Sequence, residues 1–331
     1  MPIPRRALGA AGAALLAAPN LAAPGLARAQ SWSPTRPVRL VVGFPPGGSG
    51  DFIARTLSEP LREALGQAVV VDNRPGAGSN IASEAVARAE PDGHTLLLGG
   101  NFSHAVNPAL YARIPFHPVR DFTAITRLTD LPTILAVRPQ LGITTLAQLI
   151  ERVRAEPGRW NYATPGNGTP SHLAGVMLAK AANINLTHVP FRGGAPSLQA
   201  VLSGDVELLI GTPPVALPPV RGGQLRALSL TTREASPVIE GIPGTGTAGL
   251  PGLNIGGWWG LWAPAGLPEP IRQRVFEAAR RITADPGVRE RLAREGLQGL
   301  ASESPAAFDA FIAEEIPFWA EVVRAAGARV D

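Results

Sequence analysis

Two glycine-rich stretches in this sequence combine residue types that can hold an anion. The first is FPPGGSGD at residues 44–51, and the second is TPGNGTPSH at residues 164–172. Each follows a short apolar run and precedes a helical pattern, so each predicts a turn from a strand into a helix. Glycine lets backbone N–H groups turn inward, and the first turn of a helix carries partial positive charge. An anionic oxygen is therefore a natural occupant of either loop.

Neither stretch fits a nucleotide-binding motif. The P-loop pattern GxxxxGK[ST] requires a lysine, and residues 44–51 contain none. The pattern GxGxxG occurs once, at Gly244, Gly246 and Gly249, but no predicted strand leads into it and no predicted helix follows. We interpret that segment as a flexible loop.

Catalytic and metal-binding patterns are also missing. Ser171 and His172 are adjacent, but neighbours on a helix point in different directions, and the GxSxG elbow is absent. The five histidines show no metal-ligand spacing, and the chain has no cysteine. We therefore expect no enzymatic activity, no cofactor and no metal.

Alternating strands and helices must position the two loops. The predicted strands are 38–42, 69–71, 95–98, 134–137, 161–163, 186–189, 206–210 and 225–232. The predicted helices are 51–65, 80–89, 146–155, 171–182, 269–283 and 304–326. This alternation predicts mainly parallel sheets in two α/β halves that face one another across a cleft. Both glycine-rich turns fall at carboxyl ends of strands, where open α/β sheets bind ligands.

The N-terminus has the layout of a secretory signal peptide. Arg5 and Arg6 precede an Ala-, Gly- and Leu-rich stretch that ends in Ala27-Arg28-Ala29. The paired arginines also resemble a twin-arginine signal, with Pro4 where that signal has Ser or Thr, so both export routes stay open. Removing residues 1–29 takes three arginines from a formal net charge of +4 and leaves +1. Such a chain has no bulk electrostatic attraction to nucleic acid or an anionic membrane.

Six separated motifs run in order from about residue 36 to the C-terminus. They are FPPGGSGD, VVVDNRPGAGSNIASEAVARAEPDGHTLLLG, GNGTPSHLAG, HVPFRGGAPSLQAVLSGDVELL, LRALSLTTRE and WWGLWAPAGLPEPI. Together they resemble the Bug family of extracytoplasmic solute receptors, the binding subunits of tripartite tricarboxylate transporters. The resemblance covers nearly the whole chain that follows the signal.

The resemblance implies a type II periplasmic binding protein. Its two α/β lobes would be joined by two hinge-crossing strands, near residues 131–137 and 258–264, and would close on a small solute. Lobe 1 would comprise residues 30–130 and 257–331, and lobe 2 residues 131–256. The implied function is a monomeric periplasmic receptor that captures a small organic carboxylate and delivers it to the membrane subunits of the transporter.

Family members hold a carboxylate between the two glycine-rich loops, partly through ordered water. From the residues and this resemblance we expect a ligand site made of Phe44, Gly47, Gly48, Ser49, Asp51, Ser79, Asn80, Asn101, Ser103, Thr164, Gly168, Thr169, His172, Arg192 and Thr212. Alternatives stay open for several of them. Asp51, Thr169 and the Ser79-Asn80 pair could cap helices, and Arg192 could reach a distal carboxylate or form a salt bridge.

The chain departs from the family pattern after TTRE. Where relatives continue TTRERS and later LPDVPTVAE, this sequence reads TTREASPVIEGIPGTGTAG, with Ala235 replacing the usual arginine. That segment lies near the hinge in the family, which leaves lobe closure open. Two other functions also stay open: a sensory receptor for a two-component kinase, and a hydrolase of small esters or amides on the same scaffold. The sequence does not identify the solute.

Overall fold

The computed structural model describes residues 32–330 together with Met1. The predicted signal peptide, residues 1–29, otherwise lies outside the described residues. Residues from Trp32 onward form one compact unit. No helix in this described part is long and apolar enough to cross a membrane.

The first sheet has six strands in the order β11-β4-β10-β3-β1-β2 and carries the first glycine-rich loop. Its centre is apolar and fully buried, as the runs VRLVV and TLLLGG require. Parallel pairing joins β1 to both β2 and β3, whereas β10 runs antiparallel between β3 and β4. The strands are β1 (Val38–Val42), β2 (Val69–Asn73), β3 (Thr95–Gly100), β4 (Phe122–Pro132), β10 (Gly256–Pro264) and β11 (Gln298–Gly299).

The second sheet has five strands in the order β7-β6-β8-β5-β9. Here β6 pairs in parallel with β7 and β8, and β5 runs antiparallel to β8 and β9. The prediction of mainly parallel sheets is therefore too simple. The strands next to the glycine-rich loops are parallel, but those that follow a passage between the sheets enter in the reverse direction. The strands are β5 (Ile134–Val137), β6 (Asn161–Thr164), β7 (Thr187–Pro190), β8 (Leu208–Gly211) and β9 (Arg226–Leu230).

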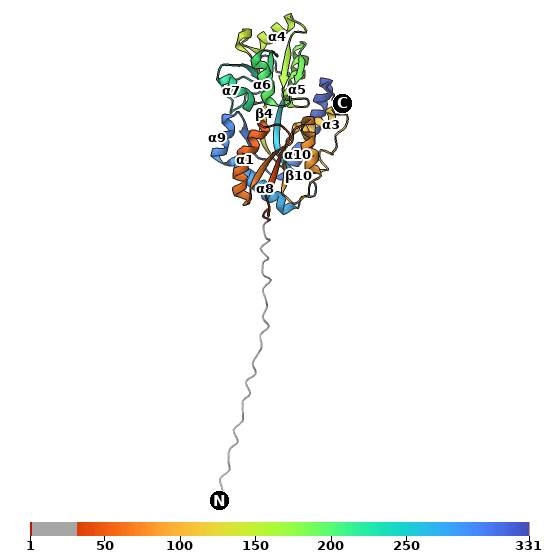
Figure 1. Cartoon of the computed structure of the whole chain (residues 1–331), viewed down its shortest axis with the longest axis vertical. Helices are drawn as coiled ribbons and strands as arrows, with labels where there is room; N and C mark the ends of the chain where they lie inside the picture. Colours follow the sequence, from red (N-terminus) through yellow and green to blue (C-terminus); the bar gives the residue numbers. More distant parts are fainter. Residues whose placement is uncertain (2–31, 331) are drawn as a thin grey trace. The chain divides into compact units, whose positions relative to one another are not determined.

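Helices cover both sheets and define two α/β lobes (Figure 1). We use lobe 1 for the elements around the six-stranded sheet and lobe 2 for those around the five-stranded sheet. The lobe 1 helices are α1 (Ser49–Leu65), α2 (Asn80–Ala87), α3 (Asn107–Leu110), α8 (Glu269–Ala284), α9 (Pro286–Arg294) and α10 (Pro305–Ala326). The lobe 2 helices are α4 (Leu146–Ala155), α5 (Pro170–Ala182), α6 (Gly194–Ser203) and α7 (Pro213–Arg221).

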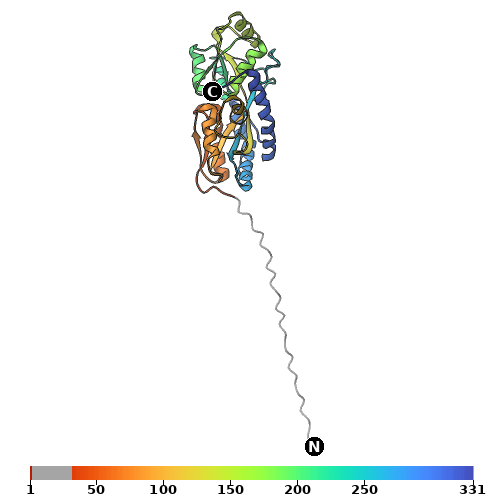
Figure 2. The ribbon, with the colours of Figure 1, turned by 90° about the vertical axis from the view of Figure 1, so that its right-hand side faces the viewer.

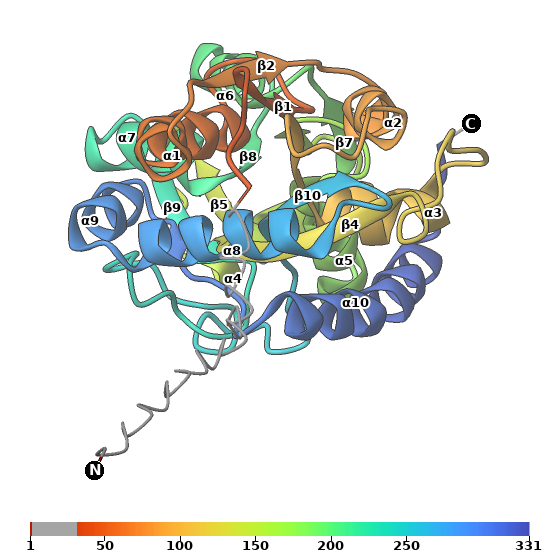
Figure 3. The same cartoon turned by 90° about the horizontal axis from the view of Figure 1, so that it is seen from below.

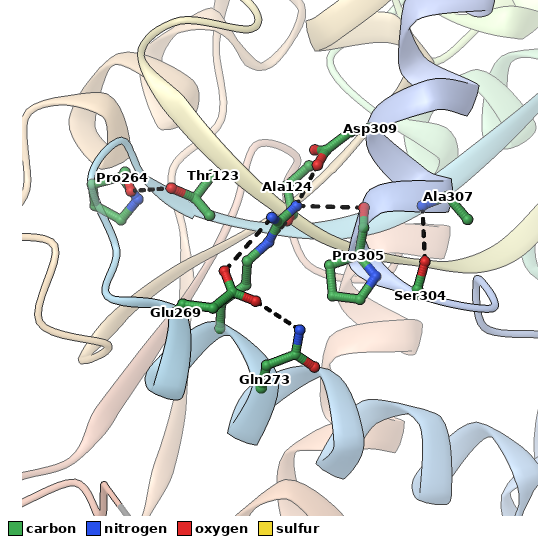
Figure 4. A network of polar contacts seen from close by, with 10 residues as sticks. Thr123, Ala124, Pro264, Glu269, Gln273, Ser304, Pro305, Ala307 and Asp309 are labelled. Carbon is green, nitrogen blue, oxygen red and sulfur yellow. Dashed lines mark hydrogen bonds and ion pairs between the residues drawn. The ribbon is translucent and has the colours of Figure 1, made fainter.

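Helix α10 packs against elements of both lobes (Figure 2). Phe308 and Ile312 in its first half join the lobe 1 core, whereas Trp319 and Val323 in its second half join a core that includes the strands of lobe 2. Figure 4 shows the polar contacts that hold its start to α8 and β4. The guanidinium of Arg272 donates to the carbonyl of Ala124 at 2.7 Å and to the Asp309 carboxylate at 2.7 Å.

The chain passes between the lobes at two places, and one threonine connects them. Thr133 stands between β4 and β5, and Ile255 leads directly into β10. The fully buried Thr231 hydroxyl lies 2.7 Å from the Thr133 hydroxyl and donates to the carbonyl of Ile255 at 2.6 Å. The atypical segment packs beside this hinge, where the amide of Thr245 donates to the carbonyl of Thr232 at 2.9 Å. The segment is a loop, as the sequence indicates, but it is anchored to the hinge, because Thr245 is fully buried.

The lobes also contact one another away from the hinge. Figure 3 shows α9 beside α1 and α7, and the guanidinium of Arg221 on α7 donates to the carbonyl of Arg294 at the end of α9 at 2.6 Å. Gly296 follows α9 with a φ of +71°, and a Cβ at this residue would lie 2.5 Å from Leu217 and 2.8 Å from Pro213. The close approach of the two lobes here requires glycine.

A matched pair of glycine substitutions tests this contact. Gly296→Ala and Gly223→Ala start from the same φ of +71°, but Gly223 has no neighbour within 4 Å of the added Cβ. Both variants bear the left-handed backbone strain of about 1–2 kcal/mol, and only Gly296→Ala adds overpacking of about 1–3 kcal/mol. We expect urea unfolding to show the larger loss for Gly296→Ala, with a larger radius of gyration by small-angle X-ray scattering. Equal losses in the two variants would contradict the contact.

Candidate functional site

The two glycine-rich loops meet at a small chamber between the lobes, which we call the inner chamber. Lobe 1 contributes Phe44, Gly48, Ser49, Gly50, Phe102 and Trp259 to its lining, and lobe 2 contributes Pro165, Thr169, Pro170, Gly193, Gly194 and Thr212. Its volume, measured as space for the centres of water-sized spheres, is about 30 Å³. On that measure a single water occupies roughly 10–15 Å³. The inner chamber therefore has room for one small group, such as a carboxylate.

Four helices begin at the inner chamber. Their N-cap residues are Gly48 for α1, Thr169 for α5, Gly193 for α6 and Thr212 for α7, and all four line the chamber. Each helix start carries partial positive charge and amides without intrahelical partners. No lysine, arginine, aspartate or glutamate is among the described residues that line it. The electrostatics of the chamber therefore come from backbone dipoles and favour an anion.

The four helix starts offer different donors. In α1 the first helical hydrogen bond runs from Phe52 to Gly48, which leaves the amides of Ser49 and Gly50 outside the helical ladder. In α5 the Thr169 hydroxyl accepts from the amide of His172 at 3.3 Å, a regular side-chain cap. Helix α7 begins with two prolines, so it contributes its dipole and the Thr212 hydroxyl, which makes no cap hydrogen bond.

Asp51 does not line the inner chamber, because its carboxylate is used within the first loop. It accepts from the amide of Gly47 at 3.1 Å and from Nε of Arg55 at 3.0 Å. Burial by itself raises the pKa of Asp51, but the hydrogen bonds from Arg55 and Gly47 outweigh it and hold the pKa below its usual value. Asp51 therefore stays ionised, and its carboxylate accepts the hydrogen bond that the Gly47 amide could otherwise donate to a ligand. The sequence suggested that Asp51 caps α1 or contacts a ligand. No side-chain cap hydrogen bond forms at α1, and the carboxylate closes the loop instead; the ligand contact stays a prediction.

Three aromatic rings form the wall of the inner chamber in lobe 1. Phe44, Phe102 and Trp259 pack edge to face, with ring centroids 4.8–6.0 Å apart. Gly50 lies against this wall, since a Cβ there would lie 2.6 Å from the Trp259 indole. The sequence analysis missed Phe102 and Trp259 as site residues. The run WWGLW gives no sign of which tryptophan faces the cleft, because only the pairing of β10 with β3 and β4 decides that.

A larger chamber adjoins the inner one, and we call it the outer chamber. Its volume is about 440 Å³ on the same measure, and it shares Phe44, Pro45, Pro165 and Gly193 with the inner chamber. Two further predicted residues, Ser79 and Arg192, line it. The predicted site residues thus divide between the inner chamber (Phe44, Gly48, Ser49, Thr169, Thr212), the outer chamber (Phe44, Ser79, Arg192) and the surrounding structure.

Three predicted residues of lobe 1 lie behind the chambers and line neither. The side-chain oxygen of Asn80 accepts from Asn107 at 2.7 Å. Asn101 accepts from the amide of Trp258 at 3.4 Å, and Ser103 donates to the carbonyl of Gly100 at 3.2 Å. These contacts hold the loops in place. Direct ligand contacts by the three residues stay predictions.

The same holds for three predicted residues of lobe 2. The Thr164 hydroxyl lies 2.6 Å from Nε2 of His188, and the amide of Gly168 donates to Nδ1 of His172 at 3.3 Å. His172 stacks on His188 with ring centroids 4.2 Å apart. The imidazole rings of His172 and His188 therefore hold the second glycine-rich loop through hydrogen bonds to Gly168 and Thr164.

Two α/β lobes, a two-stranded hinge and a chamber between helix starts from both lobes define a periplasmic binding protein. The family model described as "Tripartite tricarboxylate transporter family receptor" matches residues 53–328, and this chain belongs to that family. The resemblance and the fold expected from the sequence are both confirmed.

Individual relatives cover most of the chain. The "UPF0065 protein in tcbD-tcbE intergenic region" of Pseudomonas sp. (strain P51) is 36% identical over 85% of this chain and 84% of its own. BugT of Bordetella pertussis is 33% identical over 90% and 91%. Among solved structures, an R. palustris protein with adipate has a TM-score of 0.86 at 32% identity, covering 90% of this chain and 99% of that one. MatC from Rhodopseudomonas palustris with bound malate has a TM-score of 0.81 at 34% identity, covering 88% and 99%.

Three histidines near the site are held neutral by burial. Burial lowers the pKa of His104 to about 3 and that of His172 to about 4. The pKa of His188 is lowered to about 3 by burial and by the neighbouring charge of His172. His104 stacks flat on Trp262 with centroids 4.1 Å apart, and its Nε2 has no hydrogen-bond partner. Protonating these rings in the folded protein is therefore unfavourable.

We predict an acid-sensitive fold from these histidines. In the unfolded chain these histidines titrate near pH 6.5, so above that pH they are neutral in both states and the free energy of unfolding is at its full value. As the pH falls from 6.5 towards 4, the unfolded chain binds protons that the folded protein does not. The free energy of unfolding then falls by about 1.4 kcal/mol per pH unit for each histidine. Urea unfolding between pH 7.5 and 5 measures this slope. His104→Phe should reduce the slope by the share of one histidine, about 1.4 kcal/mol per pH unit at most. The same slope in His104→Phe as in the wild type would contradict the assignment.

Proposed function

We propose that this protein is a periplasmic receptor that binds a small organic carboxylate in the inner chamber and delivers it to membrane subunits of a tripartite tricarboxylate transporter. One observation carries the proposal: four helix starts converge on a chamber that no charged side chain among residues 32–330 lines. The family membership supports the transport role. The adipate and malate in the titles of two related structures support a carboxylate as the ligand class.

The physical argument favours an anion over a neutral solute. A helix start stabilises a negative charge by about 0.3–2 kcal/mol, the upper value applying where the geometry is partly buried. Neutral amides and hydroxyls also avoid the cost of burying an unpaired cation when no ligand is present. Water bridges can complete the shell around the carboxylate at little cost. We assign its first contacts to the amides of Ser49 and Gly50 and to the hydroxyl of Thr212.

Closure of the lobes completes the site, because lobe 1 supplies the start of α1 and lobe 2 supplies the starts of α5, α6 and α7. The lobe boundaries expected from the sequence, residues 30–130 with 257–331 and residues 131–256, are part of this proposal. So are export by cleavage of residues 1–29 and action as a monomer. A kinase-sensing receptor would bind its ligand in the same way and differs only in the partner of the closed form.

The hydrolase alternative receives less support from the geometry. The Ser171 hydroxyl is fully buried and has no hydrogen-bond partner among the described residues. The Nδ1 atom of His172 accepts from the amide of Gly168 instead. A nucleophile and its base need to lie within hydrogen-bond reach of one another. Binding without turnover is therefore the function that we propose.

A charge placed in the inner chamber tests the proposal. Ser49 is the first residue of α1, so Ser49→Asp complements the helix dipole and should not lower the thermal stability of the ligand-free protein. The same carboxylate should repel the ligand and weaken binding at least about tenfold, since like-charge contacts cost several kcal/mol. Isothermal titration calorimetry with adipate and malate measures the effect, on protein refolded to remove any carried-over ligand.

The control is Ser49→Asn, which has nearly the same shape as the Asp variant without its charge. We expect it to retain most of the affinity. Equal losses in both variants would indicate a steric effect and would contradict the electrostatic assignment. Failure of the wild type to bind any mono-, di- or tricarboxylate would overturn the proposed function.

A further inference from the structure

The protein carries an anion of its own beside the inner chamber. Asp51 is the third residue of α1, which begins at Ser49, and it is buried, with 6% of its surface exposed. An acidic side chain at the third position of a helix can reach back to the amides at the helix start, and the helix dipole attracts it. The amides of Ser49 and Gly50 belong to the same turn. The Asp51 carboxylate and the carboxylate of a solute are therefore alternative acceptors for the same donors.

In the structure the Asp51 carboxylate is turned to other donors. It accepts from the amide of Gly47 at 3.1 Å, and Nε of Arg55 donates to both of its oxygens at 3.0 Å. Arg55 lies one turn further along α1, at the spacing that favours an ion pair on a helix. No side-chain hydrogen bond caps α1. The carboxylate is thus satisfied without the amides of Ser49 and Gly50.

Burial makes Asp51 depend on these partners. Its side chain is 9% exposed, whereas that of Arg55 is 57% exposed. Burial alone raises the pKa of Asp51, but the hydrogen bonds from Arg55 and Gly47 outweigh it and lower that pKa. A buried carboxylate that loses a charged partner must find other donors, because an unpaired buried charge is costly. The amides of Ser49 and Gly50, which precede Asp51 in the chain, are such donors.

Arg55 is the cation on which the orientation of Asp51 depends. Among residues 32–330 the one ion pair of Asp51 is with Arg55. Arg39 of β1 and Arg74, which follows β2, both pair with Asp72 instead. Loss of Arg55 would therefore leave the Asp51 carboxylate without a cationic partner from the described part of the chain.

We propose that Arg55 is a positioning residue that keeps the protein's own carboxylate out of the anion site. It holds Asp51 on the Gly47 amide and thereby leaves the amides of Ser49 and Gly50 free for the carboxylate of the solute. Without Arg55, Asp51 turns to these amides and competes with the solute. This inference rests on the proposed function, in which these amides bind the solute. Arg55 thus sets the affinity of the site although its own side chain lines neither chamber.

A double-mutant cycle tests this role. Arg55→Gln is made in the wild type and in an Asp51→Asn background, where the side chain can still accept from Gly47 but is no longer a charged competitor. Isothermal titration calorimetry on refolded protein measures the dissociation constants for adipate and malate. We expect Arg55→Gln to weaken binding at least about fivefold in the wild-type background, because Asp51 then takes a helix-start interaction of that order. In the Asp51→Asn background the same change should cost less than about twofold.

Two further arginine variants separate the orientation of Asp51 from other effects. Arg55→Lys keeps a cation at the same spacing from Asp51 and should hold the affinity to within about threefold of the wild type. Arg62→Gln makes the same charge change about two turns further along α1, where Arg62 pairs with Glu59, and should bind like the wild type.

The amide resonances of the ligand-free protein give a second readout by NMR. In Arg55→Gln the amide proton of Gly47 loses its carboxylate acceptor and should move upfield. The amide protons of Ser49 and Gly50 gain that acceptor and should move downfield. Arg62→Gln should leave all three resonances in place.

A loss of affinity that is equal in the two Asp51 backgrounds would assign the effect to the charge of Arg55 itself and would overturn the inference. Unchanged affinity in Arg55→Gln, or unchanged resonances of Gly47, Ser49 and Gly50, would also overturn it. All of these outcomes leave the proposed function intact. Failure of the wild type to bind any mono-, di- or tricarboxylate would overturn the proposed function and this inference with it.

Discussion

The structure depends on the electrostatic field at one small chamber, where four helices from two lobes begin. Each helix start brings a partial positive charge, and the starts other than that of α7 also bring amides without intrahelical partners. Strands β1, β6, β7 and β8 place these four starts together, because each helix follows the carboxyl end of its strand and the two lobes turn those ends towards one another. The chamber can therefore favour an anion although no charged residue of the described part of the chain lines it. The ionised Asp51 is consistent with this field because Arg55 and Gly47 satisfy it within its own loop.

Lobe closure and ligand capture are linked through contacts outside the chamber. Thr231 connects the two hinge crossings through buried hydroxyl hydrogen bonds. Gly296 packs closely on α7, and Arg221 of α7 donates to the carbonyl of Arg294 at the end of α9. Gly193 packs closely on Pro45 of the first loop. These contacts need glycine or a specific donor because the lobes approach within van der Waals distance. The affinity for a solute then depends on its own contacts and on the free energy of bringing these surfaces together.

The sequence predicted the parts of the site whose signals are local. The first loop, the second loop and helices α1 and α5 were expected because glycine and proline interrupt clear apolar periods. Helix α7 was missed because PPVALPPVR contains four prolines, which sequence rules count against a helix; two of them stand in its first turn, where proline is tolerated. Trp259 was missed because alternation in WWGLW cannot show which face meets the cleft. Asn80 and Thr164 are polar residues at the start of α2 and the end of β6, and their partners Asn107 and His188 come from elements whose packing only the fold reveals.

The most direct test of the account is the position of a bound carboxylate in a crystal structure with adipate or malate. The account predicts carboxylate oxygens in the inner chamber, within about 2.7–3.2 Å of the amides of Ser49 or Gly50, directly or through one water. It also predicts that the lobe 2 helix starts face the same group. A carboxylate bound to an arginine outside the inner chamber, with the helix starts facing only solvent, would contradict it.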